Sequence, residues 1–373
     1  MAERWFVFGF SIRGDKGRRC GEQMSLLNLF RRQNVKKNNV QQHNYYYENN
    51  AQQNVVVNPN VEITFKEPTL RELEQQASEE AEEIAKIDAS CRKSEHGLTV
   101  SQILLLDYCK KGKYPHPEGG YQRFWWFDYG VRNVGEALEN LEAEGFIRFA
   151  TPKELLPTLK LDELKKILSE LKMPVTGKKA DLVNRISEQA NDVMLGKYIH
   201  SNKYVLTELG ESEVAANSYI PYCHSHKYTE ATIWDVNKNA DLKHWRDYIW
   251  GRFNQCSMEY ADNGQWGLYR NIRLSMAEFL YDEARYVDSF ALYAEVCFYD
   301  VNGKDCYVDY DDPSDLLLEG ILSRMKKVAI KAGLSEEQQK EIITMTTEDM
   351  SPIRRRVPNG ALPNLIMKKM QRL

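Results

Sequence analysis

Apolar residues recur three and four positions apart through most of the chain, a spacing that predicts a mainly α-helical fold. The clearest example is the stretch 158–186, which predicts two short amphipathic helices joined by a tight turn. Pro174 ends the first helix, and Thr176 is the expected N-cap residue of the second. The first helix should bury a leucine face with Ile167 beside it: Leu161, Leu164, Leu168 and Leu171. The second should bury Ala180, Leu182, Val183 and Ile186.

The start of the second helix carries cations where helices usually carry acids. Lys178 and Lys179 follow Gly177, whereas a capping box places Glu or Gln at the third helical position and the helix dipole favours acids in the first turn. Two cations at the positive end of a helix repel its dipole, and a bound anion would offset this repulsion. Free backbone N–H groups, a glycine that permits close approach and two lysines together predict a phosphate site.

This stretch resembles the motif of the SAP domain. The matching positions are Leu161, Leu164, Leu168, Pro174, Gly177, Lys178, Lys179, Leu182 and Ile186. The resemblance implies a helix-extended-helix module over residues 158–188 that binds DNA, usually through the backbone and with little sequence preference. The sequence departs from the motif at Lys172, where the family often has a helix-ending glycine, so this lysine must adopt a left-handed or otherwise adjusted conformation.

The predicted DNA contacts are the turn and the cations around it: Thr176, Gly177, Lys178, Lys179, Lys165, Lys166, Lys172 and Arg185. The stretch 158–188 has seven Lys or Arg against five acids, a net charge of +2, so a module of this size should bind duplex DNA weakly. The alternative is a helical hairpin that only packs or contacts protein.

Residues 98–222 resemble a winged-helix domain. Two helical segments, near 100–108 and at 134–144, precede a predicted strand at 146–149, and residues 203–210 resemble the last wing strand with its glycine turn. We expect the SAP module to be inserted between the two strands, with its ends close together. The helix in the recognition position carries four acids that would repel phosphates, so this domain should serve as a platform or a protein contact: Glu136, Glu139, Glu142 and Glu144.

Residues 223–350 predict an all-helical domain. The run 279–293 resembles the connection of a tetratricopeptide-type helix pair, although no period is evident and an irregular helical domain is the alternative. The closing segment 351–373 has six Lys or Arg and no acid, and it is expected to be a basic tail that adds phosphate contacts or binds an acidic partner.

The segments before residue 98 have a different composition. Residues 1–60 are rich in Asn, Gln and Tyr from Ser25 onward and predict a disordered leader, and residues 61–97 predict an exposed acidic helical linker. Gly21 to Gln23 can be encoded as a purine-rich ribosome-binding sequence before an ATG. We therefore hypothesise a true start at Met24 in a bacterial or phage gene.

Composition restricts the function classes. The 373 residues are 42% hydrophobic with a net charge of −4, so any DNA contact must come from local patches. No apolar run reaches the length of a membrane span. The seven cysteines are scattered and lack a CxxC pair, which indicates a reducing compartment. The expected location is cytoplasmic, and nucleoid-associated if the protein binds DNA.

The sequence contains no catalytic motif that we recognise: no Walker loop, no GxSxG elbow and no HExxH helix. The run from Cys223 to His226 offers three metal ligands in four residues, but zinc normally requires a second pair, so exposed loop residues are expected there. We predict no catalytic residue, no metal site and no cofactor. The predicted function is non-catalytic DNA binding, with a protein partner for the helical domain. The alternatives are a protein-interaction scaffold of a phage or mobile element, and, less favoured, a DNA-processing enzyme.

Overall fold

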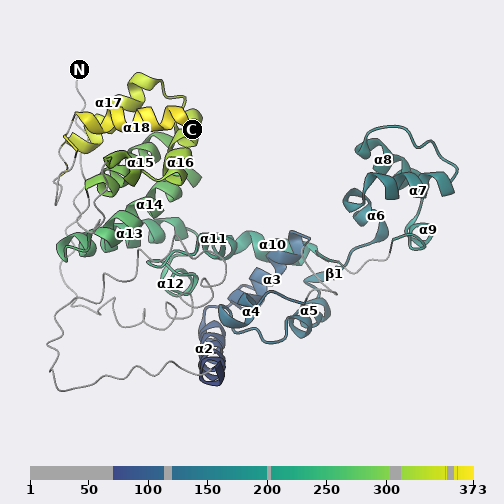
Figure 1. The fold of residues 1–373 in the computed structure, drawn as a ribbon. Coiled ribbons are helices and arrows are strands. Elements are labelled where there is room, and N and C mark those ends of the chain that lie inside the picture. Colours follow the sequence, from purple (N-terminus) through teal and green to yellow (C-terminus); the bar gives the residue numbers. More distant parts are fainter. Residues whose placement is uncertain are drawn as a thin grey trace. The chain divides into compact units, whose positions relative to one another are not determined.

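The computed structural model describes residues 70–112, 120–199, 203–302, 312–348, 350, 357–358 and 360–373 (Figure 1). These residues form helices and two short strands, which confirms the prediction of a mainly α-helical fold. The chain divides into two units, Met1–Glu80 and Ala81–Leu373. The predicted leader 1–60 and the hypothesised start at Met24 lie outside the described residues.

Helix α2 (Leu70–Ser90) is the acidic segment, and most residues of its second half are exposed, but a few positions are buried. Ile84 and Asp88 are buried, and the Asp88 carboxylate accepts hydrogen bonds from the Ser101 backbone N–H at 3.2 Å and from the Ser101 hydroxyl at 2.6 Å. Gly130 lies so close to this helix that an added Cβ would be 2.6 Å from the Ala85 Cβ. Ala85 and Asp88, in the second half of α2, therefore contact residues that follow the helix.

Helices α3 (Val100–Lys110), α4 (Phe124–Phe127), α5 (Val134–Ala143) and α10 (Glu208–Ala216) form the next part of the fold. Thr99 begins α3 in a capping box with Gln102, and Asn133 caps α5 by accepting from the Glu136 N–H. Helix α5 buries Val134, Leu138 and Leu141 and leaves its acids at the surface or partly exposed.

The two strands, β1 (Ile147–Phe149) and β2 (Tyr204–Leu206), pair antiparallel with Phe149 opposite Tyr204. One step beyond this pair, the Ala150 N–H donates to the Lys203 carbonyl at 2.8 Å. The intervening segment therefore begins and ends at neighbouring positions, as we expected for an inserted module. The assignment of the surrounding helices and strands to the winged-helix class stays a prediction.

The segment between the strands has a hydrophobic core of its own. It comprises α6 (Pro152–Leu155), η3 (Leu156–Thr158), α7 (Leu161–Glu170), α8 (Lys179–Gln189) and α9 (Asp192–Leu195). The buried cluster is Ala150, Leu155, Leu156, Leu164, Ile167, Leu168, Leu182, Ile186, Ala190, Leu195 and Ile199. Helices α6 and α9 are joined by the Lys153 N–H, which donates to an Asp192 carboxylate oxygen at 2.9 Å. The compact unit is therefore larger than the predicted 158–188.

The remaining helices are α11 (Tyr219–His226), α12 (Ile233–Asn239), α13 (Trp245–Asp262), α14 (Trp266–Asp282), α15 (Tyr286–Asn302), η4 (Pro313–Leu316), α16 (Glu319–Ala332), α17 (Glu336–Glu348) and α18 (Ala361–Arg372). Helices α14 and α15 pack together and are linked by the ion pairs Arg270–Asp300 and Arg273–Glu295. The run 279–293 thus contains the connection between two packed helices, as predicted. Its tetratricopeptide character stays a prediction.

The end of the chain is not a free basic tail over residues 361–372. These residues form α18, which buries Leu362, Ile366 and Met370, because apolar residues four positions apart provide one packed face. Lys369 lies 3.8 Å from the Asp315 carboxylate. The three arginines at 354–356 lie outside the described residues. None of the helices in the described residues contains an apolar stretch of the length that a membrane span requires.

Candidate nucleic-acid interface

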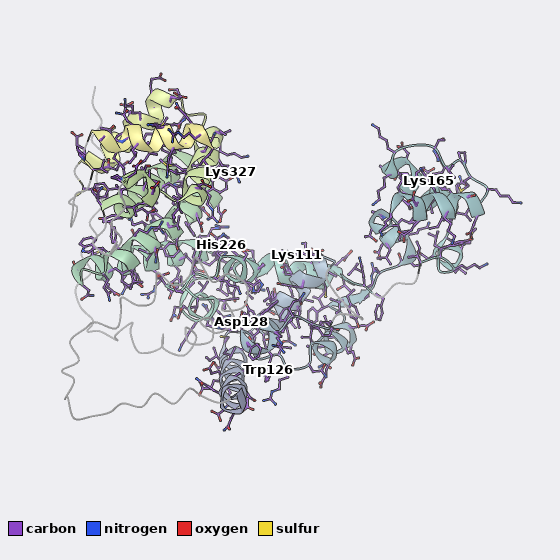
Figure 2. All side chains as sticks on the ribbon, viewed as in Figure 1. Lys111, Trp126, Asp128, Lys165, His226 and Lys327 are labelled. Carbon is purple, nitrogen blue, oxygen red and sulfur yellow. The ribbon has the colours of Figure 1, made fainter. Side chains whose placement is uncertain are left out.

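Helix α7 buries a small apolar face and exposes two lysines. Leu164, Ile167 and Leu168 are buried, whereas Lys165 and Lys166, between them in sequence, are exposed (Lys165 is labelled in Figure 2). Leu161 was expected on the buried face, but it is 39% exposed because it is the first residue of the helix, at the margin of the core.

The end of α7 confirms the expectation for Lys172, whose φ is +57°. The Met173 N–H donates to the Leu168 carbonyl at 2.8 Å, and the Lys172 N–H donates to the Ser169 carbonyl at 3.0 Å. These two bonds form the Schellman arrangement that usually has glycine at the left-handed position. The chain leaves the helix there, with the Lys172 side chain exposed.

The start of α8 differs from the sequence-based prediction. Its N-cap residue is Lys178 and not Thr176, so the first turn begins two residues later than expected. Asp181 thereby becomes the third helical residue, and its carboxylate accepts from the Lys178 backbone N–H at 2.9 Å. The expectation of a first turn without an acid was wrong. The signal was present in the sequence, because an acid three positions after a candidate cap residue is half of a capping box.

Gly177 explains the later start. Its φ is +133°, a conformation that side-chain-bearing residues rarely adopt, so the helix cannot begin before Lys178. A Cβ at this position would lie 3.2 Å from the Asp181 Cβ and 3.3 Å from an Asp181 carboxylate oxygen. The glycine therefore permits both the backbone conformation and the close approach of the capping acid.

The turn presents exposed residues and polar backbone groups. Thr176, Gly177, Lys178 and Lys179 are all exposed, as is Ala180, which had been predicted to be buried. Leu182 and Ile186 are buried as predicted, and Val183 is half-buried. Lys178 makes no side-chain cap, because an ammonium group offers no acceptor, so the N–H groups of the first turn are not satisfied by the N-cap side chain. Such groups, with two ammonium groups beside them, are suited to bind an anion.

The Arg185 side chain, predicted to contact DNA, is directed at backbone carbonyls of the turn. Its guanidinium donates to the Thr176 carbonyl at 3.1 Å and also to the Pro174 carbonyl. The predicted contact residues therefore comprise cations with exposed side chains and one half-buried arginine that is bonded to the turn itself.

Residues 156–189 match the family model of the SAP domain. A SAP domain is generally a DNA-binding module, and its presence supports a DNA-binding role for this protein. The match extends over about a tenth of the chain and covers the turn, α7 and α8. Comparison with curated proteins and with solved structures finds no match.

Residues Cys223, His224 and His226, for which no metal site was predicted, were expected to be exposed loop residues, and this expectation was wrong. They lie on α11, where Cys223 is buried and the two His224 ring nitrogens lie 2.9 Å from the Tyr108 hydroxyl and 2.7 Å from the Tyr129 hydroxyl. Burial lowers the pKa of His224 to about 4. Among the described residues, no three His, Cys, Asp or Glu side chains are grouped to hold a metal ion.

Proposed function

We propose that this protein attaches to duplex DNA without catalysing a reaction on it, and that the SAP domain binds backbone phosphates. The contacts would come from Thr176, Gly177, Lys178 and Lys179, with support from Lys165, Lys166 and Lys172. Arg185 would act through the turn, whose carbonyls its guanidinium contacts. Recruitment of a protein partner by the helical domain remains part of the proposal.

The observation that carries the proposal is the exposed Gly-Lys-Lys turn at the N-terminus of α8. Backbone N–H groups at a helix start attract a phosphate, and lysines add charge that does not depend on the base sequence. Asp181 opposes the phosphate with its negative charge. With few contacts and one opposing acid, affinity should fall in the non-specific range, with Kd of roughly 10⁻⁴ to 10⁻⁶ M at physiological salt.

Fluorescence anisotropy of the full chain with a labelled random duplex across a salt series tests this proposal. The double variant Lys178→Glu, Lys179→Glu should bind at least about tenfold more weakly at low salt. The slope of log K against log salt should decrease by the equivalent of up to about two phosphate contacts. The matched control is Lys327→Glu, Lys331→Glu on α16, where both lysines are exposed (Lys327 is labelled in Figure 2). It changes the net charge equally and should leave binding nearly unchanged.

The outcomes separate the candidate functions. Equal loss in both double variants would show that net charge, and not the turn, drives binding. Binding that survives Lys178→Glu, Lys179→Glu would direct attention to the basic residues of 351–373. If the unaltered chain binds no DNA at low salt, the proposal is wrong, and the alternative of a protein-interaction scaffold in which the SAP hairpin only packs would take its place.

A further inference from the structure

Residues 174–177, between the end of α7 and the start of α8, belong to neither helix and pair with no strand. Among the described residues, the hydrogen bonds recorded for the backbone of this segment are those that the Arg185 guanidinium donates to the Pro174 and Thr176 carbonyls. One side chain from the middle of α8 therefore holds the backbone of residues 174–177, whereas the next residue, Lys178, is held through its N–H by Asp181.

The direction of the Arg185 side chain follows from its place on the helix. Side chains of an α-helix point toward its N-terminus, so a long side chain at Arg185 reaches back along α8 to the segment that precedes it. Both hydrogen bonds come from the same guanidinium nitrogen, one to each carbonyl. They join the seventh residue of the helix to positions nine and eleven residues earlier in the chain.

These contacts occupy the Nη1 group of Arg185. A movement that turned Nη1 toward a phosphate would release both carbonyls and leave the turn without these two bonds. Charge-assisted hydrogen bonds to backbone oxygens are among the stronger ones in proteins. The guanidinium also offsets the partial negative charge of two carbonyl oxygens in a segment that is proposed to meet an anion.

We infer that Arg185 is a positioning residue. It fixes the conformation of residues 174–177 and thereby holds Gly177, Lys178 and Lys179 in the arrangement that meets a phosphate, without itself contacting DNA. This inference rests on the proposed function for its effect on DNA, but the bracing of the turn is a property of the free protein.

The test uses the full chain with Arg185→Ala, Arg185→Lys and the control Lys165→Ala. In the absence of DNA, limited trypsin digestion followed by mass spectrometry measures cleavage after Lys178 and Lys179. Arg185→Ala should accelerate this cleavage severalfold, roughly threefold or more, because local opening controls proteolysis. Lys165→Ala should not change it, since Lys165 is exposed on α7 and away from the turn in sequence.

DNA binding gives a second readout that a phosphate ligand and a positioning residue affect differently. Arg185→Ala should weaken binding while the slope of log K against log salt stays at the value of the unaltered chain. Loss of a phosphate contact at Lys165 should reduce the slope by about 0.9. If Arg185→Ala unfolds the module, which circular dichroism would reveal, Arg185→Lys carries the test. Lysine keeps the charge with a shorter reach, so cleavage should be faster than in the unaltered chain.

Two results would overturn the inference. One is unchanged trypsin cleavage in both Arg185 variants. The other is a slope reduced by about one in Arg185→Ala but restored in Arg185→Lys, which would make Arg185 a phosphate ligand. If the unaltered chain binds no DNA, the proposed function fails, but the cleavage comparison still tests the role of Arg185. Faster cleavage in the Arg185 variants supports a positioning residue, and unchanged cleavage refutes it.

Discussion

Single residues determine the geometry of the SAP turn, and two of them have positive φ. Lys172 has a φ of +57° at the end of α7, and Gly177 has a φ of +133° before α8. The first is a side-chain-bearing residue in a conformation that favours glycine, and the second is a glycine that no other residue should replace well. Substitutions at these two positions should therefore have opposite effects on stability.

Replacing Lys172 with glycine should relieve the left-handed strain, and we expect the local stability of α7 and α8 to rise by up to about 1 kcal/mol. Native-state hydrogen exchange measured by mass spectrometry on peptides from these helices reports that stability. The control is Lys165→Gly within α7, where the same substitution should destabilise by about 1 kcal/mol. A loss of protection in Lys172→Gly would contradict the strain argument.

Gly177→Ala should lower the stability of the start of α8 by about 1–2 kcal/mol, because it places a Cβ 3.2 Å from the Asp181 Cβ at an unfavourable φ. Weaker DNA binding should accompany this loss. Gly251→Ala provides the comparison: Gly251 lies within α13 with no atom near an added Cβ, so alanine should stabilise that helix by roughly 0.5–1 kcal/mol. Equal effects in the two variants would argue against a special role for Gly177.

His224 gives the protein a stability that depends on pH. Burial lowers its pKa to about 4, below the value of about 6.5 expected for the unfolded chain, so the neutral form is favoured in the fold. The contribution of His224 to the free energy of unfolding is complete above pH 6.5 and is lost as the pH falls toward 4. The melting temperature of the unaltered chain should decrease more steeply over this range than that of His224→Gln. Parallel curves would show that His224 does not titrate in this environment.

At the scale of elements, the start of helix α8 combines the proposed phosphate site with an acid whose charge opposes it. The Asp181 carboxylate satisfies the Lys178 N–H, which stabilises the helix start, but it also adds negative charge beside the lysines. The charged carboxylate of Asp181 therefore stabilises the helix but weakens phosphate binding.

Asp181→Asn should separate the effect of this residue on helix stability from its effect on phosphate affinity. The amide oxygen can still accept from the Lys178 N–H, whereas the charge is removed, so DNA affinity should increase about two- to fivefold at low salt with little change in helix stability. Anisotropy measures the affinity, and hydrogen exchange measures the helix. Glu188→Gln, which removes a charge near the other end of the same helix, should have a smaller effect on binding. An equal gain from both would indicate only the change in net charge.

At the scale of the whole molecule, the SAP domain has a hydrophobic core that is separate from the cluster formed by the rest of the described chain. Its two connections leave from paired positions, since the Ala150 N–H donates to the Lys203 carbonyl next to the β1–β2 pair. This arrangement predicts that the module can be removed without unfolding the remainder.

Deleting residues 151–202 and joining Ala150 to Lys203 through Asn-Gly should convert β1 and β2 into a hairpin with a two-residue turn. We expect the shortened chain to keep the melting transition of the remaining helices, because the larger core is intact, and to lose most DNA binding. Circular dichroism and anisotropy measure the two effects. Retained DNA binding would place the interface outside the SAP domain, and loss of folding would show that the two cores are coupled.

Local sequence determined those features that depend on spacing over a few residues. The leucine periodicity predicted α7, the Gly-Lys-Lys run predicted a turn that carries two cations, and the missing glycine at Lys172 predicted a left-handed or otherwise adjusted residue. All three are present in the structure. A helix and its caps are formed by groups within about four positions of one another, so a single sequence contains the information.

Tertiary structure alone decided which distant groups meet. Arg185 appeared to be one more cation for DNA, but folding directs it to carbonyls nine and eleven residues away. His224 appeared to be a loop residue, but it lies between two tyrosines that are far from it in sequence. The last basic segment contains a packed helix because its apolar face finds a partner in the core. Charge and periodicity are properties of the chain, whereas burial and hydrogen-bond partners are properties of the fold.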